Sequence, residues 1–233
     1  MRRSIVLVVT SVSEEPAWRQ RAVERSTHAA KLRAEQRVQR FLDSAQELIA
    51  EKGTTDFTVQ EVVDRSKQSL RSFYQHFDGK HELLLALFED ALFKSAAEIR
   101  EVIAAESDPL KRLRTAVEVL YRNSHPHSGA QQPLFSDFAL QLLVRHPAEV
   151  AAANQPLLTV FTELIEQAAE AGAVPRGRPR RRAALVTQTV MFAAFVAQVG
   201  AAEGPATPIT AEEVWRFCLG GLSAAPPEAD EQA

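Results

Sequence analysis

The sequence predicts an all-α protein in which an N-terminal three-helix bundle precedes a larger helical C-terminal domain. Ala, Leu, Glu, Gln and Arg, which are good helix formers, dominate the long segments between breaks. In these segments apolar residues recur three or four positions apart, which is the period of a helix with one buried face. The breaks contain proline or glycine, and no strand-like alternation bounded by turn residues is present. With 233 residues, 45% of them hydrophobic, the chain can bury a sizeable core.

Residues 1–34 precede the first predicted helix. An apolar run at residues 5–9 is too short for a signal peptide and is soon followed by acidic residues. We therefore expect residues 1–34 to be a flexible extension. Its part from residue 19 to 33 is basic, and such an arm either reaches a DNA minor groove or remains a solvated tail without a fixed contact.

Residues 35–82 predict the three-helix bundle. A first helix at 35–52 has one apolar stripe, and Gly53 is a natural stop. Thr58 and Glu61 have the spacing of a capping box, so a short second helix begins there. The apolar stripe of the first helix consists of Val38, Phe41, Leu42, Ala45, Leu48 and Ile49.

A polar break at residues 66–68 separates this second helix from another short one at 69–76, which carries Phe73 towards the same core. Asp78 and Gly79 then cap a long helix at 80–104. Two short helices across a tight turn, with hydrogen-bond donors on the outer face of the second, form a helix-turn-helix. This layout places one helix in the DNA major groove.

The C-terminal domain is expected over residues 83–225, followed by an acidic, disordered tail at 226–233. Proline- or glycine-containing breaks divide it into further helices. These helices are expected at 110–122, 134–144, 148–171, 180–202 and 210–222, the last with a capping box of Thr210 and Glu213.

At these residues the chain resembles a known family. The run SFYQHFDGKHELL, from Ser72 to Leu84, is similar to the signature of TetR-type transcriptional regulators. The specific resemblance covers about residues 41–88, and the order of the later helices is also similar. The family usually has glycine and then an aliphatic residue in the turn, where this chain has Lys67 and Gln68. Lys67 is therefore expected to adopt a left-handed conformation, which is uncommon for a residue other than glycine.

DNA contacts are predicted on the second short helix and at the helix N-termini beside it. Arg71 and Gln68 suit base edges, since Arg matches guanine and Gln matches adenine. Contacts with the phosphates of the DNA backbone are expected from Tyr74, His76 and Lys80. Thr58 is expected to bring a hydroxyl and a helix N-terminus to the same backbone. The resemblance implies the same phosphate role for Tyr74 and Lys80. The full predicted set is Thr58, Gln68, Ser69, Arg71, Ser72, Tyr74, His76 and Lys80.

A homodimer is predicted from the last two helices. Residues 183–202 carry no charge, but polar residues at 187–189 argue against a membrane span, so a helix buried on several sides is expected. Two copies of this helix and the next could form a four-helix interface. The resemblance implies a dimer interface in the same place. The predicted interface residues are Val190, Ala194, Val214, Phe217 and Cys218.

Large apolar side chains in the central helices either form core or line a small-molecule pocket. The resemblance implies an effector pocket in this part of the chain, filled by a hydrophobic or amphipathic compound. The predicted lining residues are Phe88, Leu92, Tyr121, Phe138, Leu142, Phe161, Met191, Phe192 and Phe195.

Other chemistries find little support in the sequence. The single cysteine, Cys218, excludes an internal disulfide and fits a reducing cytoplasm. His125 and His127, with Asp137 and His146 further on, could supply ligands, but nothing in the sequence makes three or four of them converge as a metal site requires. No nucleophile elbow or phosphate-binding glycine loop is present, so neither an enzyme nor a cofactor is predicted. The net charge of −3 neither indicates nor excludes nucleic acid.

The sequence thus predicts a cytoplasmic, homodimeric repressor that a small effector releases from a palindromic DNA operator. One alternative is a DNA-binding regulator that responds to no effector. Another is a helical carrier of lipids or other hydrophobic compounds with a vestigial helix-turn-helix.

Overall fold

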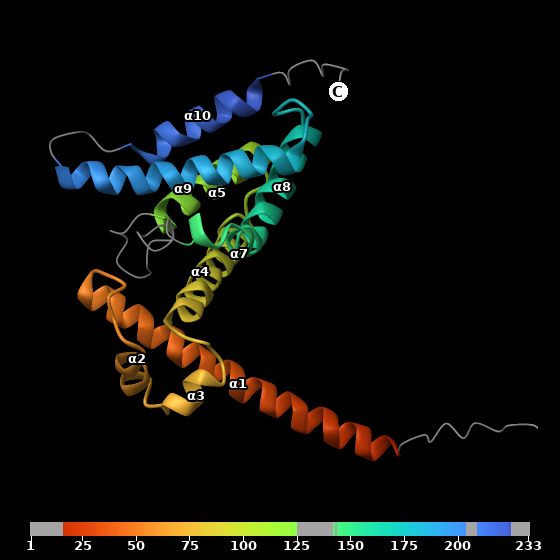
Figure 1. Ribbon diagram of the computed structural model, residues 1–233. Coiled ribbons are helices and arrows are strands. Elements are labelled where there is room, and N and C mark those ends of the chain that lie inside the picture. Colours follow the sequence, from red (N-terminus) through yellow and green to blue (C-terminus); the bar gives the residue numbers. More distant parts are fainter. Residues whose placement is uncertain (1–15, 125–141, 143, 204–208, 225–233) are drawn as a thin grey trace, which may run out of the picture.

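The computed structural model describes residues 16–124, 142, 144–203 and 209–224, and every regular element in these ranges is an α-helix (Figure 1). The all-α prediction is confirmed. None of the described helices is long and apolar enough to cross a membrane.

The N-terminal bundle is formed by α1 (Ala17–Lys52), α2 (Val59–Ser66), α3 (Leu70–Tyr74) and the start of α4 (Lys80–Val102). Its core centres on aromatic rings that meet edge to face: the ring centroids of Phe41 and Phe73 are 5.4 Å apart. Arg65 of α2 forms two hydrogen bonds to the Glu51 carboxylate of α1, which fastens α2 to the end of α1. The buried members of this core are Phe41, Leu42, Ala45, Leu48, Phe57, Val62, Val63, Phe73, Phe77, Leu83, Leu84 and Leu87.

The helix α1 begins well before the predicted position 35. The prediction of a flexible extension is therefore wrong for residues 17–34, which are helical; residues 1–15 lie outside the described residues. We call residues 17–34 the projecting half of α1, because it runs past α3 with no other described helix beside it (Figure 1). Good helix formers such as Ala, Arg and Glu fill it, and the packed half of α1 supplies the helix nucleus that an isolated segment would lack.

The C-terminal domain contains α5 (Pro109–Asn123), α7 (Pro147–Ala153), α8 (Gln155–Glu170), α9 (Pro179–Glu203) and α10 (Ala211–Ser223). The helices α5, α8 and α9 pack against one another, and α10 packs on α5 and α9 (Figure 1). Their shared core includes Leu120, Leu157 and Phe161, which are fully buried.

Two of the expected C-terminal helices, at 148–171 and 134–144, are not found as single described helices. The single helix expected at 148–171 is divided at Asn154, whose side-chain amide donates to the Val150 carbonyl. Pro156 explains the division, because proline lacks the backbone N–H that would continue the earlier helix but fits the first turn of a new one. Of the helix expected at 134–144, only residues 142 and 144 are described.

The helix α4 belongs to both hydrophobic cores. Leu83, Leu84 and Leu87 lie in the core of the N-terminal bundle, whereas Phe88 and Leu92 lie in that of the C-terminal domain. The continuous helix α4 therefore connects the two cores.

Candidate nucleic-acid interface

The turn between α2 and α3 is built around Lys67. Its backbone has φ 54° and ψ 39°, and it is the only residue other than glycine with a positive φ among the described residues. The expectation of a left-handed lysine is confirmed. The backbone N–H of Gln68 donates to the Val63 carbonyl at 3.2 Å, which closes the C-terminus of α2. The turn thus keeps the helix-turn-helix geometry without glycine.

The side chain of Gln68 is directed away from a DNA-reading role. Its amide nitrogen donates to the Arg37 carbonyl of α1 at 2.9 Å, and the side chain is half-buried. This contact fastens the turn to α1, and Gln68 would have to break it in order to reach an adenine edge. The geometry therefore favours a structural role over the predicted base contact.

The recognition helix α3 presents a small exposed surface. Ser69 caps it, since the Ser69 hydroxyl accepts from the Ser72 backbone N–H at 3.1 Å. Phe73 is fully buried, whereas Arg71 is exposed and the Tyr74 side chain is 55% exposed. The Tyr74 ring meets the Phe73 ring edge to face at 5.4 Å, so its position is fixed by the core. Arg71 and Tyr74 are consequently well placed for contacts outside the protein.

Two other residues predicted to contact DNA, Ser72 and His76, have buried polar atoms. The Ser72 hydroxyl oxygen and the Nε2 atom of His76 are buried, and neither has a hydrogen-bond partner within the described part of the chain. Burying such groups without a partner costs free energy. Either atom would have to become accessible before it could touch a phosphate.

Lys80 lies near the N-terminus of α2, which Thr58 caps. The Thr58 hydroxyl accepts from the Glu61 backbone N–H, and the Glu61 carboxylate accepts from the Thr58 backbone N–H at 2.7 Å, so the predicted capping box is confirmed. The Lys80 ammonium lies 4.8 Å from the ring centroid of Phe57, the residue before Thr58. The Lys80 cation and the N-terminus of α2 are thus close together, which suits a phosphate, whereas the Thr58 hydroxyl already donates to the Glu61 carboxylate at 3.0 Å.

The Glu61 carboxylate also accepts from the Lys52 ammonium at 2.7 Å. The hydrogen bond from Lys52, together with those from Thr58, lowers the pKa of Glu61 to about 2. This carboxylate therefore stays ionised and holds the capping box over the whole physiological pH range.

The residues predicted to line an effector pocket are mostly core. Phe88, Leu92, Tyr121, Leu142, Phe161 and Met191 are buried in the C-terminal core. The Tyr121 hydroxyl donates to the Ile209 carbonyl just before α10, which ties these two segments together. Phe192 is 56% exposed, Phe195 is half-buried, and Phe138 lies outside the described residues.

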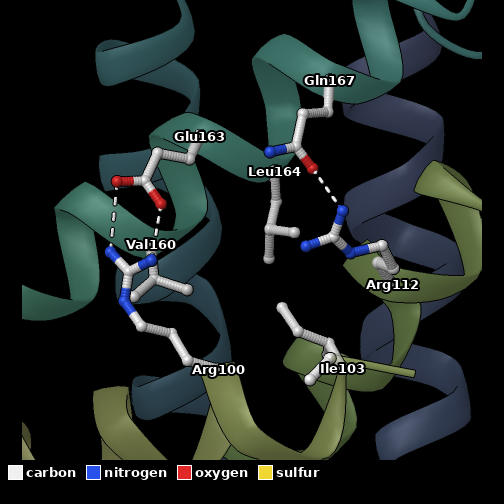
Figure 2. A pocket seen from close by; sticks show the side chains of 8 residues that line it. Arg100, Ile103, Arg112, Val160, Glu163, Leu164 and Gln167 are labelled. Carbon is white, nitrogen blue, oxygen red and sulfur yellow. Dashed lines mark hydrogen bonds and ion pairs between the residues drawn. The ribbon is translucent and has the colours of Figure 1, made fainter. Parts of the chain in front are cut away.

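A small cavity lies instead between α4, α5 and α8 (Figure 2). It has a volume of about 220 Å³, and sequence reasoning missed it because its members lie on three helices and share no local motif. Figure 2 shows Arg100 paired with Glu163, and Arg112 donating to the Gln167 side chain at 2.8 Å. The Nε atom of Arg112 is buried without a hydrogen-bond partner among the described residues. The lining residues are Arg100, Ile103, Ala104, Arg112, Val160, Glu163, Leu164 and Gln167.

A second cavity, of about 340 Å³, lies beside the C-terminal end of α8 and the segment that follows it. Its lining includes Glu166, Arg176 and Arg182. None of the residues predicted for the effector pocket lines either cavity.

The predicted dimer interface requires a correction. Val190, Ala194, Val214 and Cys218 are at most 5% exposed and are packed inside the protomer. The physical reason is that the most apolar faces of α9 and α10 cover the protomer's own core. Only Phe217 of the predicted set is on the surface, at 72% exposed.

The described residues contain no group of three or more His, Cys, Asp or Glu side chains arranged to hold a metal ion. His125 and His127 lie outside these residues, and His146 is placed 3.4 Å from the Glu149 carboxylate.

Comparisons with known proteins agree with this geometry. Residues 41–87 match the family model for bacterial regulatory proteins of the tetR family. The transcriptional repressor KstR2 of Mycobacterium tuberculosis is 27% identical over 192 residues, which cover 78% of this chain and 91% of KstR2. The transcriptional activator FasR of Mycolicibacterium smegmatis is 27% identical over 138 residues, which cover 59% of this chain but only 62% of FasR.

Among solved structures, that of RolR in complex with resorcinol is similar with a TM-score of 0.63 and 17% sequence identity. The superposition covers 83% of this chain and 91% of RolR, so the shared fold includes both domains. The helix-turn-helix at residues 58–80 lies inside the matched segment, so residues 41–87 form a DNA-binding domain of the tetR type, and the chain is similar to TetR-family transcriptional regulators over most of its length.

Proposed function

We propose that the protein is a homodimeric repressor that binds a palindromic operator through α3 and is released by a small amphipathic effector. The observation that carries the proposal is the exposed surface of α3, where Arg71 and Tyr74 project from a helix fixed by the Ser69 cap and the buried Phe73. An arginine on such a helix can donate two hydrogen bonds to one guanine. Of the residues predicted to read bases, Arg71 remains the candidate.

Phosphate contacts would position α3 in the groove. Lys80 and the N-terminus of α2 supply a cation and free backbone N–H groups close together, and Tyr74 supplies a hydroxyl. Contacts of this kind fix the register of the protein on the duplex without carrying sequence information.

An exposed apolar stripe on α9 supports dimer formation. Leu185, Phe192 and Val196 are 60%, 56% and 39% exposed, and their spacing of seven and then four places them on one face of the helix. Phe217 is an exposed apolar side chain on the neighbouring α10, where Gly220 and Gly221 are also exposed and leave room for a close approach. An apolar surface of this kind is typical of an interface, and a second copy of the chain is the proposed partner. We propose these residues in place of the four buried ones.

The cavity between α4, α5 and α8 is the proposed effector site. Its walls of Ile103, Val160 and Leu164 are apolar, while Arg112 and Gln167 offer hydrogen-bonding groups, so it suits a compound with one apolar and one polar end (Figure 2). The buried Nε of Arg112 would gain a partner from an acceptor on the effector.

Effector binding at this cavity would act on DNA binding through α4. Arg100 and Ile103 lie at the C-terminal end of this helix, and Lys80 is its first residue. An effector that favours one position of α4 would favour one spacing of the two recognition helices. The size of its effect on DNA affinity equals its difference in affinity for the two arrangements.

The test is selection of genomic fragments by the purified protein at two salt concentrations, followed by sequencing of the retained DNA. We expect a palindromic site whose two halves have the spacing of a two-fold dimer. Retention that is independent of sequence and disappears with salt would contradict the proposal. It would favour the alternative of a carrier with a vestigial motif.

A further inference from the structure

The projecting half of α1 buries none of its described side chains. Every side chain described between Trp18 and Arg33 is exposed. At 1.5 Å per residue the segment extends the helix by about 27 Å beyond the packed part of α1. Figure 1 shows it running past α3, on which the recognition surface lies. A rigid segment of this length at the DNA-binding end calls for a partner outside the protomer.

The charges of this segment are distributed unevenly around the helix. Phe41 marks the side of α1 that faces α3, because its ring packs on Phe73. Counted at 3.6 residues per turn, four cations lie within about a quarter turn of that side. They are Arg19, Lys31 and Arg33 of the projecting half, and Arg37 shortly after it.

The one acidic residue of the segment, Glu24, and Glu35 just after it lie elsewhere. Glu24 and Glu35 are displaced by more than about a quarter turn from Phe41, and Arg21 and Arg25 lie on the opposite side of the helix. Lys31 pairs with Glu35 at 3.8 Å, so the positive charge on the side of α1 that faces α3 comes mainly from Arg19, Arg33 and Arg37.

We propose that the projecting half of α1 is a second DNA-binding element that contacts backbone phosphates of the duplex outside the base pairs read by α3. This inference rests on the proposed function, since it requires that α3 binds an operator. A positive helical face complements the regular row of phosphates, and it needs no fixed hydrogen-bond geometry to do so. With about 3.4 Å per base pair, a 27 Å helix could extend the contacted duplex by up to about eight base pairs on each side of the operator.

Arginine side chains on both faces of the projecting half are positioned by hydrogen bonds to backbone carbonyls of the same helix. The Arg33 Nε donates to the Ala29 carbonyl at 3.1 Å, and on the opposite face the Arg25 Nε donates to the Arg21 carbonyl at 3.2 Å. Arg33 and Arg37 on one face and Arg21 and Arg25 on the other are all exposed, and one arginine of each pair makes the same kind of contact with its own helix. This symmetry provides a matched control.

The experiment compares the double variant Arg33→Gln/Arg37→Gln with Arg21→Gln/Arg25→Gln in the full chain. Both lose two positive charges from exposed helical positions, so both should keep the fold and the Tm of the parent protein. The operator is the one obtained by genomic selection with the parent protein. DNA affinity is measured over a range of salt concentrations, and the protected length is measured by hydroxyl-radical footprinting.

We expect the Arg33/Arg37 pair to flatten the plot of log affinity against log salt by about one to two units, since each lost phosphate contact removes about 0.9. The same variant should shorten the protected region at its outer edges, while the Arg21/Arg25 pair leaves both measurements near those of the parent protein. Equal effects of the two pairs would overturn the proposal in favour of a diffuse charge effect. No effect of either pair would assign the segment to a partner other than DNA. Failure of the parent protein to select any operator would instead contradict the proposed function.

Discussion

The Lys80 ammonium lies over the ring of Phe57, 4.8 Å from its centroid, so a predicted phosphate ligand is positioned by a residue of the hydrophobic core. Cation–π contact holds the charge at the N-terminus of α2 before DNA arrives. Lys80→Ala should therefore weaken binding to all sequences and flatten its salt dependence by about one unit. Arg71→Ala should instead relax the base preference at one position of each half-site, at a cost of about 1–3 kcal/mol. Affinities for a set of single-base operator variants distinguish the two, and identical profiles would contradict this division of roles.

Replacement of Gln68 should affect stability rather than sequence preference. Gln68→Ala removes the hydrogen bond to the Arg37 carbonyl, and we expect the free energy of unfolding to fall by about 1 kcal/mol. The site selected from random DNA should stay the same. Gln75→Ala, at an exposed position after α3, is the control and should leave stability unchanged. A changed adenine preference in the Gln68 variant would restore the base-reading role.

Lys67 occupies a conformation that glycine would adopt without strain. Lys67→Gly should raise the free energy of unfolding by about 0.5–1 kcal/mol, because the left-handed penalty exceeds the extra flexibility of glycine in the unfolded chain. Lys67→Val should lower it, since a branched side chain is disfavoured there. Urea denaturation measures both, and a destabilised glycine variant would show that the lysine side chain itself contributes.

The N-terminal bundle should lose stability in acid through Glu61. The pKa of this carboxyl is lowered to about 2 in the folded protein from an ordinary value of 4.5, so the folded state favours the ionised form. Its contribution is present above pH 4.5 and is lost as the pH falls towards 2. Glu61→Gln should therefore have a smaller decrease in Tm between these values than the parent protein. An unchanged pH profile would mean that the cap contributes nothing measurable.

The exposed stripe of α9 should control dimer formation. Phe192→Glu or Phe217→Glu places a charge in the proposed interface, and we expect sedimentation equilibrium to show monomers at concentrations where the parent protein is dimeric. Phe93→Glu is the matched control: Phe93 is 64% exposed but lies on α4. A control that dissociates as readily, or interface variants that stay dimeric, would move the interface elsewhere.

The sequence was most informative where local rules determine the structure. The capping boxes at Thr58 and Thr210, the stop at Gly53 and the left-handed Lys67 each depend on residues a few positions apart, and each is found. Packing between distant segments could not be predicted in the same way. Val190 and Phe217 are both apolar on apolar helices, and only the tertiary structure shows that one faces the core and the other the surroundings.

The projecting half of α1 was missed for a different reason. Amphipathic periodicity reports burial on one side, and the segment from Trp18 to Arg33 buries none of its described side chains. The sequence pattern of a helix without a buried stripe cannot be distinguished from that of an irregular extension. The cavity at Arg112 was missed because its members belong to separate helices that meet only in the folded chain.

The single cysteine makes the protein convenient for chemical labelling. Cys218 is buried, and burial raises the pKa of its thiol to about 11, so at neutral pH it is protonated and shielded from thiol reagents. A cysteine introduced at the exposed position of Gln75 would therefore take up a spin label selectively. In a dimer, one such label per chain forms a pair whose separation follows the two recognition helices. Titrating candidate effectors against that distance would identify a compound by the movement it causes, even while the operator sequence is still unknown.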